Sequence, residues 1–281
     1  LDVYSDRKNI YVRPAKVWNR DSETMFLPHI YNREAGTFKP ILDGVQSSRF
    51  YQVLGKFQRP GEEQFTDSWN RFFNTAKMLY DNHMNTDDAC NTMCDIMMTR
   101  DEKMRRMVKK HFTPEDYFRV RNHMIGTGMI GGKACGMLLS RAIVRNLAPD
   151  IEEVLEPHDS FFIGSDVYYT YIVDNGFWDI RIRQREEKEY FSLAEEFAQR
   201  LKEGAFSEEM KNQFLHILEY YGQDPFIVRS SSILEDGFGN AFAGKYESVF
   251  CANRGTLEER LLEFENAIKT VYASSMSLSA L

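Results

Sequence analysis

Residues 126–136 read Gly-Thr-Gly-Met-Ile-Gly-Gly-Lys-Ala-Cys-Gly and place Lys133 directly after a pair of glycines. Apolar residues follow at four-residue steps, so the sequence predicts a helix over residues 133–147. The free N–H groups and the positive dipole end of a helix start favour anions, and glycine lets a phosphate approach the backbone. A lysine in the first turn is otherwise unfavourable there. The pattern therefore indicates a phosphate as a partner for Lys133.

Other interpretations of the same glycines have to be weighed. A dinucleotide fingerprint needs a buried strand before it, and residues 119–125 make a poor strand. A Walker A loop fails because Thr127 stands at its first glycine position and Ala134 replaces its metal-binding hydroxyl. A loop that only caps a helix explains the glycines as well as a phosphate site does.

A second segment with phosphate-binding chemistry covers residues 228–248, Val-Arg-Ser-Ser-Ser-Ile-Leu-Glu-Asp-Gly-Phe-Gly-Asn-Ala-Phe-Ala-Gly-Lys-Tyr-Glu-Ser. Arg229 ends a predicted strand and precedes three hydroxyls, a donor set that suits phosphate oxygens. The glycines that follow could fold over a nucleotide. The alternative is a surface loop whose arginine pairs with Glu235 or Asp236. The residues alone leave both open.

Together the two segments resemble the N-terminal domain of the phosphoenolpyruvate synthase and pyruvate phosphate dikinase family. Residues 160–169 occupy the place of a family strand-then-helix stretch, although its usual Pro-Gly pair is missing. The resemblance covers about residues 120–281. The other family motifs are G-G-K-A-x-G at 131–136, V-R-S-S at 228–231, E-D followed by A-F-A-G at 235–244, Y-E-S at 246–248, and V-Y-A-S, where the family has V-W-A-S, at 271–274.

The resemblance implies an α+β fold, in which a helical accessory region precedes the first lobe of an ATP-grasp-type domain. It implies ATP and Mg²⁺ as cofactors, with the metal ligands and all catalytic residues outside this chain. Lys133 and Arg229 would contact the phosphates of ATP. The remaining ATP-binding residues would be Gly131, Gly132, Ser230, Ser231, Gly244 and Ser248.

The family's chemistry implies a phosphotransferase that passes a phosphoryl group from ATP, through a phosphohistidine, to pyruvate. The first thirty residues are charged and aromatic rather than signal-like, so we expect a cytoplasmic protein. The chain is expected to be the ATP-binding portion and inactive by itself. Its partners would be ATP and the phosphohistidine and pyruvate/phosphoenolpyruvate domains of a longer parent chain. Two alternatives are an antibiotic phosphotransferase of the rifamycin type and a non-catalytic nucleotide-sensing or scaffold protein.

The pattern along the chain predicts two parts, an accessory region over 1–115 and the nucleotide-binding lobe over 116–281. The first part reads as irregular with short strands and then as helical from Glu62, with 101–110 as a solvated continuation. In the second part we expect helix starts at Ser165 or Asp166, at Ser207, and at the capping boxes 192–195 and 256–259. A further short strand is predicted over 245–251.

Composition supports a globular protein, with 43% hydrophobic and 27% charged residues. Residues 1–120 carry 19 basic and 17 acidic side chains, and residues 121–281 carry 16 and 25. No basic stripe indicates a nucleic-acid partner, and no apolar run approaches the ~20 residues of a membrane helix. Cys90 and Cys94 are expected to be reduced core residues rather than metal ligands.

The resemblance predicts one geometric feature of the fold. Lys133 and Arg229 must face one cleft, although they lie far apart in the sequence. We expect both cationic groups to be exposed, poorly paired and replaceable with little loss of stability.

Overall fold

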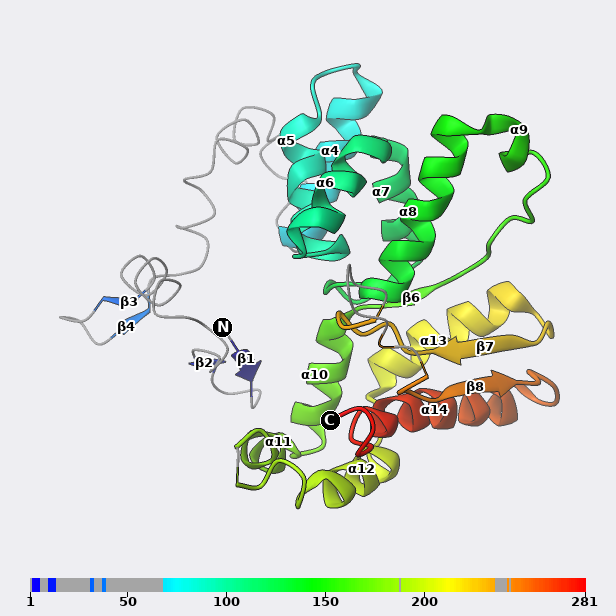
Figure 1. Ribbon diagram of the computed structural model, residues 1–281. Helices are drawn as coiled ribbons and strands as arrows, with labels where there is room; N and C mark the ends of the chain where they lie inside the picture. Colours follow the sequence, from blue (N-terminus) through cyan, green and yellow to red (C-terminus); the bar gives the residue numbers. More distant parts are fainter. Residues whose placement is uncertain are drawn as a thin grey trace. The chain divides into compact units, whose positions relative to one another are not determined.

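The computed structural model describes residues 68–281 except Glu187, residues 236–241 and Ala243, and it describes the backbone of four short strands within residues 2–38. The chain divides into two compact units, Leu1–Asn91 and Thr92–Leu281 (Figure 1). The second unit combines helices with short sheets, which confirms the predicted α+β class. None of the described helices has the length and apolar character that crossing a membrane requires. The functional boundary predicted at residue 115 stays a prediction.

The first unit contains two antiparallel strand pairs and the helix α4 (Ser68–Asp81). One face of α4 is buried at Phe72, Phe73, Ala76 and Leu79, and the helix lies within the part of the chain predicted to be helical. The strand pairs are β1 (Asp2–Ser5) with β2 (Ile10–Arg13), and β3 (Tyr31–Asn32) with β4 (Thr37–Phe38).

The first half of the second unit is mostly helical. Asp101 caps α6, because its carboxylate accepts the N–H of Met104 at 2.8 Å. Met104 and Val108 are buried, so the prediction of a solvated continuation over 101–110 is wrong. α5 (Asp87–Met93) spans the boundary between the two units. The helices that follow it are the π-helix η1 (Cys94–Met98), α6 (Glu102–His111), α7 (Pro114–Asn122), α8 (Gly132–Leu147) and α9 (Pro149–Glu152).

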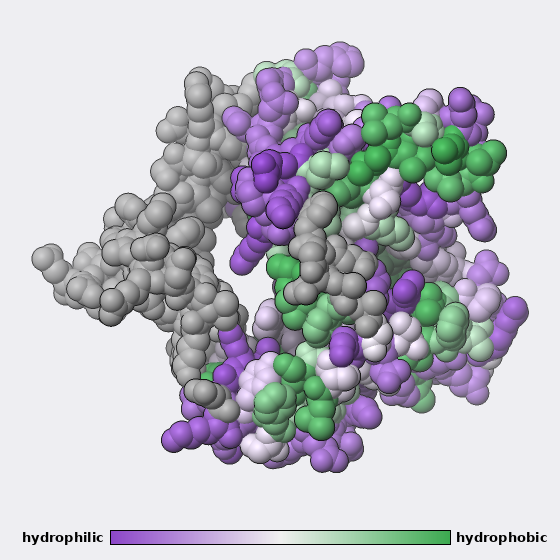
Figure 2. All heavy atoms as spheres, viewed as in Figure 1, coloured by the Kyte–Doolittle hydropathy of each residue, from purple (hydrophilic) through white to green (hydrophobic). Residues whose placement is uncertain are grey.

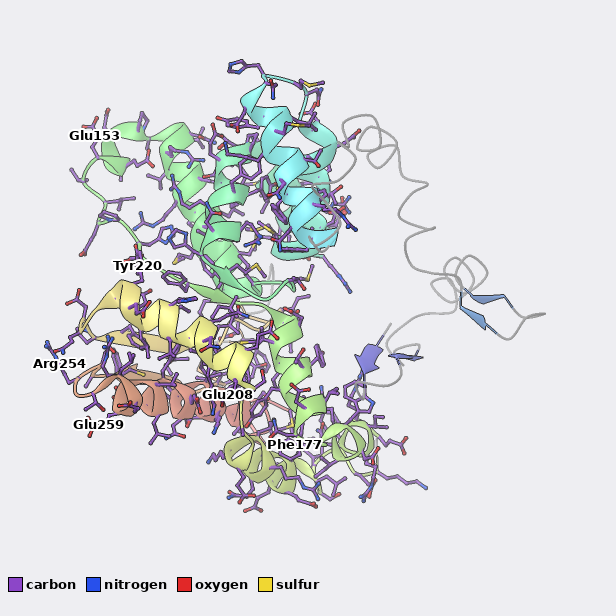
Figure 3. All side chains as sticks on the ribbon, turned by 180° about the vertical axis from the view of Figure 1, so that it is seen from behind. Glu153, Phe177, Glu208, Tyr220, Arg254 and Glu259 are labelled. Carbon is purple, nitrogen blue, oxygen red and sulfur yellow. The ribbon has the colours of Figure 1, made fainter. Side chains whose placement is uncertain are left out.

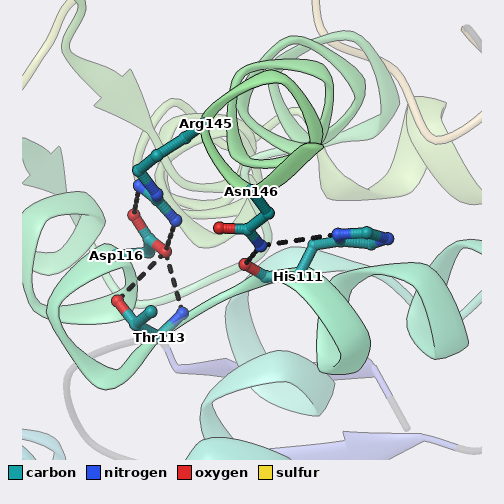
Figure 4. Close-up of polar contacts among 5 residues, drawn as sticks. All are labelled: His111, Thr113, Asp116, Arg145 and Asn146. Carbon is teal, nitrogen blue, oxygen red and sulfur yellow. Dashed lines mark hydrogen bonds and ion pairs between the residues drawn. The ribbon is translucent and has the colours of Figure 1, made fainter. Parts of the chain in front are cut away.

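Polar bonds join α7 to the C-terminal half of α8 (Figure 4). The two carboxylate oxygens of Asp116 accept from two guanidinium nitrogens of Arg145 at 2.7 and 2.6 Å, and one also accepts the N–H of Thr113 at 2.8 Å. Burial raises the pKa of Asp116, but the bonds from Arg145 and Thr113 outweigh it and lower the pKa overall. Asn146 also donates to the carbonyl of His111 at 2.8 Å. These contacts fix the direction of α8.

The predicted apolar stripe of α8 is only partly buried. Leu139 is buried, but Leu147 is 72% exposed. Leu147 belongs instead to an exposed apolar patch over α9 and the end of α8 (Figure 2), together with Ile151, Val154 and Leu155.

The glycine-rich segment lies between a short strand and α8. β5 (Met124–Ile125) pairs in parallel with β6 (Phe162–Ile163), and the chain between them contains α8 and α9. Residues 119–122 belong to α7, which confirms that no long strand precedes the glycines. The strand pairing brings residues 126–129 beside the start of α10 (Ser165–Asp174).

The rest of the second unit combines helices with a two-stranded sheet (Figure 1). Aromatic side chains form much of its core. Phe214 is fully buried, with its ring centroid 5.0 Å from Phe206 and 5.1 Å from Phe264. Phe226 contacts Phe264 at 5.2 Å, which attaches the sheet to α14. The elements are α10, α11 (Trp178–Gln184), α12 (Ala194–Glu203), α13 (Glu208–Tyr221), β7 (Phe226–Arg229), β8 (Ser248–Cys251) and α14 (Leu257–Ser274).

Three predicted helix starts are confirmed, because α10 begins at Ser165 and helices also follow Ser207 and Thr256, and one is wrong. Ser207 accepts the N–H of Met210, and Thr256 and Glu259 form a reciprocal capping box. No helix starts at Ser192, because the N–H of Leu193 already bonds to the carbonyl of Glu189 in a preceding turn. The strand predicted over 245–251 is limited to β8.

Phe214→Ala should lower the free energy of unfolding of the second unit by about 3–5 kcal/mol, because it removes a buried ring and leaves a cavity. Phe250→Ala is the matched control, since that ring is 81% exposed, and it should change stability by less than about 0.5 kcal/mol. Urea unfolding followed by circular dichroism measures both. Equal effects of the two substitutions would contradict the assigned core.

Candidate nucleotide-binding site

Gly131 and Gly132 form the start of α8 and lie against the segment that follows β7. Gly131 is the N-cap and has a φ of +85°, a conformation that favours glycine. The N–H of Gly132 donates to the carbonyl of Ser232 at 3.0 Å, and the N–H of Ala134 donates to Ser231 Oγ at 2.9 Å. The helix start and the Arg-Ser-Ser-Ser segment are therefore in direct contact.

The approach of these two segments is too close for a side chain at either glycine. A Cβ on Gly131 would lie 1.5 Å from the carbonyl oxygen of Ser231. A Cβ on Gly132 would lie 2.0 Å from the carbonyl oxygen of Glu235. Both glycines are thus required for the protein's own backbone contact, which the sequence interpretation had attributed to a phosphate.

Lys133 forms an ion pair with Glu235, with Nζ 2.7 Å from Oε1. The side chain of Glu235 is 2% exposed and that of Lys133 is 27% exposed. The expectation that Lys133 is poorly paired is therefore wrong. The cause is the carboxylate of Glu235, which follows 102 positions later in the sequence and is buried beside the start of α8.

Glu235 is held by further donors from its own loop. Its Oε1 accepts from the hydroxyl of Ser230 at 3.2 Å, and its Oε2 accepts from the N–H of Ser232 at 2.9 Å. A buried carboxylate needs such compensation. The alternative in which Glu235 pairs with Arg229 does not hold, because the partner of Glu235 is Lys133. The other candidate partner of Arg229, Asp236, lies outside the described residues.

Arg229 and Ser248 lie opposite one another on the antiparallel pair β7–β8. Both are exposed, and directly opposed residues share a face of a sheet. Among the residues that the structure describes, Arg229 forms no ion pair. Arg229 is two residues before Ser231, so its backbone lies within about 7 Å of the contact with α8. The structure thus places Arg229 and Lys133 on neighbouring segments of one unit.

The front of the glycine-rich segment is held by the start of α10. The carboxylate of Asp166 accepts the N–H of Thr127 at 3.0 Å and that of Gly128 at 2.7 Å. Ser165 Oγ accepts the N–H of Met129 at 3.1 Å. The prediction that Ser165 or Asp166 caps its own helix is wrong, because both side chains serve this loop and Gly164 is the N-cap. With these N–H groups bonded internally, a dinucleotide-type loop is again disfavoured.

The described part of residues 242–248 returns to the same region. Burial raises the pKa of Tyr246, a hydrogen bond with Ser232 opposes the shift, and the charge of Glu235 adds to it. Tyr246 therefore lies close to the loop that holds Lys133. Gly244 is exposed, has a φ of +71° and has open space where a Cβ would be.

Among the described residues, protein side chains alone do not form a metal site. No group of three His, Cys, Asp or Glu side chains gathers there in a way that could hold a metal ion. Arg229 and Lys133 fit phosphate groups better than a cation.

Sequence reasoning missed the structural roles of Glu235, Asp166 and Ser165. The sequence interpretation included Glu235 in the Glu-Asp motif, but considered it only as a possible partner for Arg229. A signal was present nonetheless, because an acidic residue close to a predicted strand and a lysine at a helix start both need partners. Asp166 gave no such signal, since a helix-start aspartate is explained by local capping.

In this α+β unit, a helix that starts with Gly-Gly-Lys contacts the Arg-Ser-Ser segment at the end of a strand. This is the arrangement expected of a nucleotide-binding domain. Residues 127–281, more than half of the chain, match the family model described as "Pyruvate phosphate dikinase, AMP/ATP-binding domain". The chain belongs to this family, which confirms the resemblance drawn from its motifs. No curated protein and no solved structure gives a match.

Gly131→Ala should be more destabilising than Gly176→Ala. Both glycines have positive φ values, +85° and +71°, so both substitutions incur the conformational cost of about 1–2 kcal/mol. Only Gly131 faces a backbone atom, whereas Gly176 has open space around it. Thermal unfolding measures the difference, and equal shifts in Tm would show that the close contact with Ser231 does not exist.

Lys133→Ala should lower the stability of the second unit by about 1–3 kcal/mol, because it leaves the carboxylate of Glu235 buried without a cation. Adding Glu235→Gln should restore most of the loss, since the charge is then gone. Lys211→Ala is the matched control: Lys211 is 28% exposed, but its partner Glu208 is 86% exposed, so little should change. A Lys133→Ala protein as stable as the Lys211→Ala protein would contradict the buried pair. The measurement is chemical unfolding of the three variants and the wild-type protein.

Proposed function

We propose that the chain binds ATP beside the contact between the Gly131–Gly132 turn and the end of β7, with Lys133 and Arg229 on its phosphates. The chain would be the ATP-binding part of a dikinase-type phosphotransferase, in which a phosphohistidine carries the phosphoryl group on to pyruvate. The observation that supports this most is the direct bonding of the two candidate segments through Gly132, Ala134, Ser231 and Ser232.

Lys133 can bind a phosphate without leaving Glu235. An ammonium group has three N–H donors, and the pair with Glu235 uses one of them. The side chain is 27% exposed, so the other donors are accessible from solvent. In this proposal Glu235 orients Lys133, and phosphate oxygens accept the remaining N–H bonds.

Arg229 supplies the second cation. A guanidinium group presents paired donors that suit phosphate oxygens, and the exposed position of Arg229 leaves them accessible. Ser248, opposite on β8, adds a hydroxyl on the same face. Gly244, with its open surroundings, would lie along the nucleotide.

Ser230 and Ser231 would act mainly through the loop rather than on the nucleotide. The hydroxyl of Ser230 is bonded to Glu235, and that of Ser231 accepts from the start of α8. Their place in the proposed site is therefore to hold Lys133 and Arg229 together. For phosphoryl transfer the protein contributes chiefly such positioning and neutralisation of charge.

Arg229→Ala and Lys133→Ala should each weaken ATP binding by at least about tenfold, equivalent to about 1.4 kcal/mol. Calorimetric titration of ATP into the purified protein measures this, on samples shown by circular dichroism to be folded. Arg254→Ala is the control for Arg229, because Arg254 follows the opposite end of β8 (Figure 3), and Lys211→Ala is the control for Lys133.

Glu235→Gln gives a second arm of the same experiment. It keeps the size of the side chain but removes the charge that orients Lys133, so a weakening smaller than that of Lys133→Ala is expected. ATP binding that is unchanged in both Arg229→Ala and Lys133→Ala would defeat the proposed site.

A further inference from the structure

A cavity of about 90 Å³ lies between α7, α8, α9 and the segment that leads into β6, within the second unit. It is separate from the start of α8: the wall residue of α8 closest to Gly132 is Leu138, six residues away and about 9 Å along the helix axis. Its ionisable lining consists of Arg119, Arg141, Arg145, His123, His158, Asp116 and Glu152.

The charges of this lining are not balanced. Asp116 is bonded to Arg145 through both carboxylate oxygens (Figure 4). Arg119 and Arg141 remain, with Glu152 as the other carboxylate of the wall. Arg141 donates to the carbonyl of Glu156, a neutral acceptor. In the part of the chain that the structure describes, neither Arg119 nor Arg141 forms an ion pair.

His158 shows that the surroundings of the cavity are electropositive. Its Nδ1 is buried and has no hydrogen-bond partner among the described residues. Burial lowers the pKa of His158, and the charges of Arg141, Arg119 and His123 lower it further, against a smaller opposing effect of Asp159. Nδ1 of His158 has no partner of its own, and in the tautomer that carries the proton on this nitrogen an anion would supply the acceptor.

The imidazole ring of His123, the other histidine of the cavity wall, is held in place by its own contacts. His123 Nδ1 lies 3.0 Å from the carbonyl of Arg119, so this nitrogen carries the proton and donates. The ring of His123 packs against Phe161 with centroids 5.1 Å apart. His123 therefore forms a fixed wall, and the adaptable donors are Arg119, Arg141 and His158.

We propose that this cavity is an anion site for a single phosphate group, held by the guanidinium groups of Arg119 and Arg141 and by Nδ1–H of His158. Paired N–H donors of arginine match phosphate oxygens. The volume is far below the ~300–1,000 Å³ of sites that enclose a whole nucleotide-sized ligand. The ligand is thus inorganic phosphate, or the phosphate of a monoester whose remainder stays outside.

The test is a titration of the protein with inorganic phosphate, followed through the imidazole resonances of His158 by two-dimensional NMR. Phosphate should shift these resonances saturably and raise the pKa of His158, because the anion stabilises the imidazolium form. Chloride at equal ionic strength should do neither. A parallel titration with methyl phosphate separates the two sources: equal affinity indicates a monoester site, and weaker binding indicates a site for the free ion.

Arg119→Gln and Arg141→Gln should each weaken phosphate binding by at least about tenfold. Arg254→Gln, an exposed arginine away from the cavity, should not. The Arg119 and Arg141 variants should keep ATP affinity, and Arg229→Ala should keep the phosphate response of His158. This arrangement separates failure of this site from failure of the proposed ATP site.

Three results would overturn the inference. One is a wild-type protein in which phosphate moves His158 no more than chloride does. Another is loss of the response in Arg229→Ala, which would place the phosphate at the ATP site. The third is a response that survives both the Arg119 and the Arg141 substitution. The first result does not depend on whether any variant folds.

Discussion

The carboxylate of Glu235 is 2% exposed, and a charge so deeply buried must be met by a cation and by hydrogen-bond donors. Lys133 supplies the cation, and Ser230 and Ser232 supply the donors. These partners come from a helix start and a strand end about 100 positions apart. The burial of one acidic group therefore fixes the start of α8, with Lys133, against the segment that follows β7.

This constraint also explains how an acidic part of the chain can hold a polyphosphate. Residues 121–281 carry 16 basic and 25 acidic side chains, so their overall charge repels anions. Local groups must act instead. Glu235 does not cancel Lys133 as a phosphate ligand, because one carboxylate oxygen uses only part of the donor capacity of an ammonium group. The pair keeps Lys133 in place, while Arg229 stays exposed on the adjacent sheet.

Local rules predicted much of the fold. The capping box at Thr256 and Glu259 and the cap at Ser207 form as expected, because their bonds reach only three residues along the chain. The same rules failed at Asp166, whose carboxylate bonds to N–H groups 38 and 39 positions away. They failed at Leu147 too, since periodicity indicates a helix face but not what covers it.

The candidate site was predictable as far as motifs could specify it. Glycine pairs, a lysine and an Arg-Ser-Ser segment indicated phosphate chemistry, and the family resemblance indicated that they converge. The sequence did not predict that the backbone of residues 231–235, rather than a ligand, fills the space beside Gly131 and Gly132. Such a contact depends on tertiary packing, which neither spacing nor residue type expresses.

The most direct test of this account is an experimental structure of the protein with a non-hydrolysable ATP analogue. The account predicts Nζ of Lys133 within hydrogen-bond distance of both Glu235 and a phosphate oxygen, with the guanidinium group of Arg229 on the same phosphate chain. A phosphate chain bound elsewhere, or bound only after Lys133 has separated from Glu235, would contradict it.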